Sequence, residues 1–79
     1  MGYSVRYSKL AEKYLHAQTA ETRRRIVTAI GILPNGDVKK LQGRGGYRLT
    51  IGGVRVLFDY IDSSTIDVVA IGNRGDVYK

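Results

Sequence analysis

The pattern of hydrophobic and polar residues differs between the two halves of this chain. In the first half, hydrophobic residues recur mostly at the spacing of a helix. The stretch Tyr3–Tyr7 alternates in residue type and contains aromatic and β-branched side chains, which predicts a short strand. Ser8 is suited to cap a helix that follows it. The apolar residues after Ser8 recur at helical spacing: Leu10, Ala11, Tyr14 and Leu15.

A second helix is predicted directly after the first. Thr19 is its candidate N-cap, and Glu21 lies in the first turn, where a negative charge is favourable. Pro34-Asn35-Gly36 ends it. Its apolar side is formed by Ile26, Ala29, Ile30 and Leu33. Because the connection between the helices is short, we expect an antiparallel helix pair.

The second half has the pattern of strands. Tyr47–Ile51 and Val54–Ile61 are separated by Gly52-Gly53, a favourable two-residue hairpin turn. After a turn at 62–64, Ile66–Ile71 is an apolar run suited to a central strand. The sequence therefore predicts an α+β fold: an N-terminal strand, an antiparallel helix pair, and a three-stranded meander forming an antiparallel sheet.

The turn also predicts the hairpin register. With two turn residues, Thr50 lies opposite Arg55, and directly opposed residues share a face of the sheet. The face towards the helices is then formed by Tyr47, Leu49, Ile51, Val54, Val56 and Phe58. The other face carries Arg48, Thr50, Arg55 and Leu57. Two arginines thus converge from neighbouring strands, either as a functional cluster or as an ordinary solvated face.

Length and charge narrow the possibilities. The 79 residues correspond to one domain, residues 1–79, and contain no cysteine. The formal net charge of +6 suits a polyanion, such as RNA or DNA, or an acidic protein partner. No apolar run approaches the ~20 residues of a membrane span, and no signal peptide is recognised, so we expect a cytoplasmic protein that does not bind membranes.

Several kinds of site are not expected. His16 is the single histidine and lies on a predicted helix, which excludes a two-histidine ribonuclease mechanism. The acidic residues are scattered without a zinc or calcium pattern, so neither a metal nor a cofactor is expected. The glycine-rich segment 41–46 lacks the Gly-Lys-Ser/Thr ending of a P-loop. It is either a phosphate-binding loop, through its backbone N–H groups, or a flexible connection.

Other basic residues are secondary candidates for RNA or ribosome binding. Lys39 and Lys40 precede the glycine-rich segment, and Arg44 lies inside it. Arg23 and Arg24 belong to a basic triplet that spreads around the second helix, and we interpret that triplet mainly as a solvated surface.

Four residues together are suited to RNA cleavage: Arg48, Arg55, Arg74 and Tyr78. Phosphoryl transfer needs positive charge near the phosphate oxygens and a group that moves protons. Arginine forks supply the charge. A tyrosine acts as a base only where nearby cations stabilise its phenolate, and it can also stack on a nucleobase.

Three segments resemble the RelE/ParE superfamily of bacterial toxin–antitoxin toxins, and the resemblance covers nearly the whole chain. They are Leu41-Gln42-Gly43 before Tyr47-Arg48-Leu49, then Val54–Phe58, and finally Ile71–Tyr78, which is the most specific. The chain is most similar to the RelE branch. This similarity implies a ribosome-dependent endoribonuclease that cleaves mRNA in the A site by metal-free attack of a 2′-hydroxyl.

The resemblance also implies roles for the four residues. Arg48 and Arg55 would stabilise charge on the phosphate in the transition state. Arg74 would contact the phosphate and protonate the leaving group, and Tyr78 would be the general base. Two positions depart from the pattern: Thr50 stands where some members have a second lysine, and Asn73 where many have histidine.

The expected partners follow from the family as well. They are a cognate acidic antitoxin, mRNA on the ribosome, and operator DNA bound through the antitoxin complex. Two alternatives remain open at this point. One is a ParE-like gyrase inhibitor, and the other is a catalytically degenerate homologue that still binds an antitoxin.

Overall fold

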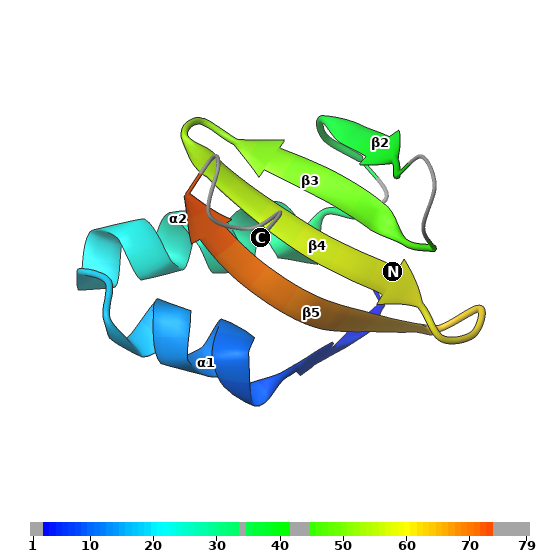
Figure 1. The fold of residues 1–79 in the computed structure, drawn as a ribbon, viewed down its shortest axis with the longest axis horizontal. Coiled ribbons are helices and arrows are strands. Elements are labelled where there is room, and N and C mark those ends of the chain that lie inside the picture. The colour runs from blue at the N-terminus through cyan, green and yellow to red at the C-terminus, as the bar shows by residue number, and fades with distance from the viewer. Residues whose placement is uncertain (1–2, 34, 42–44, 74–79) are drawn as a thin grey trace.

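A computed structural model of the chain describes residues 3–33, 35–41 and 45–73, and in this part the fold has two layers (Figure 1). Two helices lie on one face of a five-stranded sheet. The elements in chain order are β1 (Ser4–Tyr7), α1 (Lys9–His16), α2 (Ala20–Gly31), β2 (Val38–Lys40), β3 (Tyr47–Ile51), β4 (Val54–Tyr60) and β5 (Thr65–Asn73). The predicted α+β class is confirmed.

Both helices begin where the capping residues predict. The Ser8 hydroxyl accepts a hydrogen bond from the Ala11 backbone N–H at 3.0 Å, and the Thr19 hydroxyl accepts one from Thr22 at 3.2 Å. These caps satisfy N–H groups that have no partner within the helix. Within the described ranges, no helix has the length and apolar character needed to cross a membrane.

The sheet has the order β1-β5-β4-β3-β2, and it differs from the predicted antiparallel sheet in two respects. The strands from β2 to β5 are antiparallel to their neighbours, but β1 pairs with β5 in parallel. The prediction also missed β2, which pairs with β3 at the opposite edge. The sheet is therefore mixed. The parallel pair arises because the two helices carry the chain from β1 back across the sheet before the meander begins.

The core lies between the helices and the sheet face predicted to accept them. Ala11 and Leu15 from α1, and Ile26 and Ile30 from α2, pack in one buried cluster with apolar residues of β3, β4 and β5. The largest fully buried side chains include Phe58, Leu49, Val56, Ile66 and Val68. Among residues 3–33, 35–41 and 45–73, the helices pack on this face of the sheet only, and no helix packs on the opposite face.

Candidate functional site

The hairpin of β3 and β4 has the register that its two turn residues predict. Ile51 lies opposite Val54, and Thr50 lies opposite Arg55. The turn needs glycine, because Gly52 has a backbone φ of +58°. Arg48 lies opposite Leu57, two residues further along each strand. Arg48, Thr50, Arg55 and Leu57 therefore share the side of the sheet turned away from the helices, which we call the open face.

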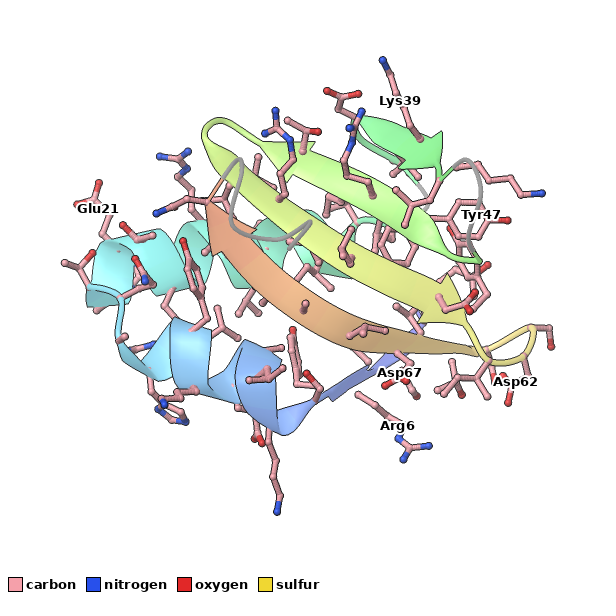
Figure 2. All side chains as sticks on the ribbon, viewed as in Figure 1. Arg6, Glu21, Lys39, Tyr47, Asp62 and Asp67 are labelled. Atoms are coloured by element: carbon pink, nitrogen blue, oxygen red, sulfur yellow. The ribbon has the colours of Figure 1, made fainter. Side chains whose placement is uncertain are left out.

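A third basic residue joins the open face from β2. Lys39 lies directly opposite Arg48, so Lys39, Arg48 and Leu57 form a row across three strands. Lys39 is exposed and projects from the β2 edge (Figure 2). Its neighbour Lys40 lies opposite Tyr47, on the face that bears the helices. The two lysines of this pair thus lie on opposite faces of the sheet.

Both arginines of the open face are half-buried, and each is held close to the sheet. The Nη1 of Arg55 donates hydrogen bonds to the carbonyl oxygens of Gly52 at 3.2 Å and Val54 at 3.5 Å. The guanidinium group is therefore drawn back towards its own hairpin turn. The Nε of Arg48 is buried. Partial burial strengthens the attraction of these cations for a phosphate, because water screens the charges less.

The far half of the open face carries acidic residues. Asp59 of β4 lies directly opposite Asp67 of β5, and Asp67 lies opposite Arg6 of β1. Figure 2 shows Arg6 and Asp67 near the β1 edge, and Lys39 at the other edge of the sheet. On the open face, Lys39, Arg48 and Arg55 therefore lie on β2, β3 and the start of β4, whereas Asp59 and Asp67 lie at the end of β4 and on β5.

The helical arginines named as RNA or ribosome contacts lie on the helix layer. The Nε of Arg23 donates to the carbonyl oxygen of Leu15 at 2.9 Å, and its Nη2 donates to those of Gln18 at 3.0 Å and His16 at 3.5 Å. Arg23 therefore holds the end of α1 in place. Arg24 is exposed and lines a groove between α2 and the hairpin.

Three predicted site residues, Arg44, Arg74 and Tyr78, lie outside the described residues. The last described residue is Asn73, whose side chain accepts a hydrogen bond at 3.0 Å from the Tyr14 hydroxyl of α1. Asn73 also lies opposite Val54, which places it on the helix side of the sheet. This residue therefore helps to anchor the end of β5 against α1, a contact between distant segments that no sequence signal indicated.

The described phenol groups with shifted pKa values lie on the helix side of the sheet. Burial raises the pKa of Tyr60, and negative charge on Tyr3 or Tyr47 raises it further. The rings of Tyr3 and Tyr60 are 5.3 Å apart, and those of Tyr47 and Tyr60 are 5.1 Å apart. Burial likewise raises the pKa of Tyr7. A raised pKa keeps these phenols protonated, so none of them is suited to act as a base.

The arrangement of basic side chains on the open face is suited to binding an anion. In the described part of the chain, no three His, Asp or Glu side chains are grouped as metal ligands would be. Lys39, Arg48 and Arg55 instead offer positive charge from three adjacent strands, and a phosphodiester backbone is the common biological ligand for such a surface. Sequence reasoning identified the two arginines on this face but did not assign Lys39 to it, since β2 was not predicted.

No protein-family model and no curated protein sequence matches the chain, but solved structures do. The RelE–RelB complex of Pyrococcus horikoshii OT3 contains a chain with 27% identity and a TM-score of 0.74, aligned over 98% of this chain and 100% of that one. A chain of the toxin–antitoxin complex RelBE2 of Mycobacterium tuberculosis matches with 21% identity and a TM-score of 0.76, aligned over 94% of this chain and 100% of that one. The isolated RelE toxin of E. coli matches with 21% identity and a TM-score of 0.66, aligned over 96% of this chain and 90% of that one.

Proposed function

We propose that this chain, which has the RelE-like toxin fold, is the toxin of a type II toxin–antitoxin system and cleaves mRNA on the ribosome. The observation that carries the proposal is the meeting of Lys39, Arg48 and Arg55 on the one sheet face that the helices leave open. In a RelE-like fold, a basic open face is suited to hold the backbone of a single RNA strand.

The proposed reaction is an intramolecular transesterification. The 2′-oxygen of the RNA forms a bond to the adjacent phosphorus while the bond to the 5′-oxygen breaks. The products are a 2′,3′-cyclic phosphate and a 5′-hydroxyl. Arg48 and Arg55 would neutralise the charge that develops on the phosphate oxygens. Tyr78 would accept the proton from the 2′-hydroxyl, and Arg74 would give a proton to the leaving 5′-oxygen, as the resemblance implies.

The proposed protein partner is an acidic antitoxin, because two of the similar structures are complexes of RelE with RelB and this chain carries a net charge of +6. A groove of about 490 Å³ between α2 and the hairpin is suited to receive a segment of it. Ile32, Ala29 and Ile51 form its apolar part, while Arg24 and Arg25 offer charge to acidic residues. Operator DNA would be bound through the antitoxin complex.

The proposal is tested by primer extension on a translated reporter mRNA in a purified translation system. We expect the wild-type protein to cut within translated codons. Arg55→Ala and Tyr78→Phe should each lower the cleavage rate at least a hundredfold, since they remove transition-state charge and the proposed base. Arg6→Ala is the matched control for charge, because Arg6 lies on the same face three strands from Arg48 and near Asp67.

The outcomes separate the open alternatives. Cleavage by wild type and Arg6→Ala, with loss in the other two variants, supports a ribonuclease that uses this face. Intact mRNA, together with inhibition of DNA supercoiling by gyrase, would replace the proposal with a ParE-like toxin. If neither mRNA cleavage nor gyrase inhibition is observed, the remaining alternative is a homologue that binds an antitoxin without being toxic.

A further inference from the structure

A hollow of about 330 Å³ lies on the open face beside the basic residues, and neither the fold nor the proposed chemistry accounts for it. Its lining includes Leu57 and Asp59 of β4, Val69 of β5, Leu41 directly after β2, and Gly46 directly before β3. Leu57 is also the residue directly opposite Arg48. The hollow therefore adjoins the surface proposed to hold the RNA phosphates.

Two backbone irregularities occur at residues next to or within the lining of the hollow. A β-bulge shifts the register between Leu57 and Phe58, so that Val69 is an extra residue of β5 and is 49% exposed. Gly46 has a φ of +101°, and a Cβ there would lie 3.1 Å from the carbonyl oxygen of Phe58. Gly46 and Asp59 both line the hollow, and a side chain at position 46 would also approach the Cδ1 of Leu41, another lining residue, at 3.9 Å.

The lining combines apolar walls with one carboxylate. Leu41, Leu57 and Val69 offer surface on which the flat face of a nucleobase can pack. Asp59 is exposed, and its Oδ1 accepts the backbone N–H of Tyr60 at 2.9 Å. A carboxylate on the face proposed to bind RNA phosphates repels the RNA backbone, but it can accept a hydrogen bond from a nucleobase. It also lies opposite another carboxylate, Asp67, a pairing that is unfavourable in a sheet.

We propose that this hollow binds one base of the RNA strand and that Asp59 accepts a hydrogen bond from its exocyclic amino group. The inference rests on the proposed function, because the neighbouring arginines would hold the phosphate of the same strand. Cytosine, adenine and guanine carry such an amino group, whereas uracil has none and presents the carbonyl oxygen O4, which a carboxylate repels, at the position of the cytosine amino group. Asp59 is therefore a specificity-determining residue that disfavours uracil.

The test measures binding of RNA that cannot be cleaved. Fluorescence anisotropy at low ionic strength compares 2′-O-methyl hexamers of cytidine and of uridine, whose blocked 2′-oxygen prevents transesterification. We expect the wild-type protein to bind the cytidine hexamer about tenfold more tightly, within the discrimination typical of a good base contact. Asp59→Asn should reduce this ratio below about twofold, because an amide also donates to the uracil oxygen.

Asp67→Asn is the matched control. It makes the same change in charge and relieves the same pair of opposed carboxylates, but Asp67 does not line the hollow. It should therefore keep the tenfold preference. Equal affinity of the wild-type protein for the two hexamers, absence of binding to either, or the same response in both variants would overturn the inference.

These outcomes are distinct from those of the cleavage experiment. Cleavage of mRNA by a protein that binds both hexamers equally would leave the proposed function intact without the base site. A cytidine preference that depends on Asp59, found without mRNA cleavage, would retain the base site and remove the ribonuclease.

Discussion

Replacing Arg23 by methionine should destabilise the fold, although its place in a basic triplet suggested a role in RNA or ribosome binding. Its guanidinium group makes two short hydrogen bonds, to the carbonyl oxygens of Leu15 at 2.9 Å and Gln18 at 3.0 Å, and a longer one to His16. Hydrogen bonds from charged donors contribute about 1.5–3 kcal/mol each, and solvent lowers this at a half-buried site. We therefore take about 1 kcal/mol for each short bond, or about 2 kcal/mol in all.

Methionine retains an unbranched apolar stem, so the substitution removes the hydrogen bonds and the charge while keeping much of the packing. In a domain of this size, a loss of about 2 kcal/mol lowers Tm by roughly 8–16 °C. Thermal unfolding followed by circular dichroism measures the shift. Arg24→Met is the control, since it removes the same charge from an exposed position of the same helix. Equal Tm values for the two variants would refute the structural role assigned to Arg23.

Two further predictions concern backbone strain and pH. Gly46→Ala should lower the free energy of unfolding, measured in urea, by about 2 kcal/mol, because it combines a positive φ with a Cβ close to the carbonyl oxygen of Phe58. Gly45→Ala is the control: its Cβ meets no atom within 4 Å, so it should change the free energy of unfolding by less than about 0.5 kcal/mol. The pKa of Tyr60 is raised in the folded state, so the folded protein holds this proton more tightly than the unfolded chain does. The free energy of unfolding should therefore fall as pH rises through about 10. Tyr60→Phe should make that fall shallower, because it removes the titrating phenol. Similar stability of the two glycine variants, or an unchanged pH dependence in Tyr60→Phe, would contradict these assignments.

The local parts of the fold could be predicted from sequence because their signals lie within a few residues. Ser8 and Thr19 begin helices through contacts three residues away, and the turn at 52–53 alone determines which residues of the hairpin face each other. That is why Arg48 and Arg55 could be assigned to one face. The roles of Arg74 and Tyr78 rest on the family resemblance and stay predictions.

The remaining parts depend on contacts between distant segments. Val38–Lys40 has no apolar alternation, and it is a strand because β3 offers hydrogen-bonding partners at its edge. The split of Lys39 and Lys40 between two faces follows only from that pairing. The contacts of Arg23 likewise depend on where α1 ends relative to α2. Secondary-structure propensity and hydrophobic periodicity carry no information about contacts between segments that are distant in the sequence.

The parallel pairing of β1 with β5 has a consequence for the synthesis of the protein. β5 lies between β1 and β4, so the first strand has no neighbour in the sheet until residues 65–73 have been made. Bringing β1 and β5 together closes a loop of most of the chain, which is entropically unfavourable and slow. Helices that form earlier cannot yet pack on the sheet, because most of its strands have not been synthesised. A nascent chain therefore cannot complete this sheet before residues 65–73 have been synthesised. The order of the strands delays folding, and with it any activity of the fold, until translation of the domain is nearly finished.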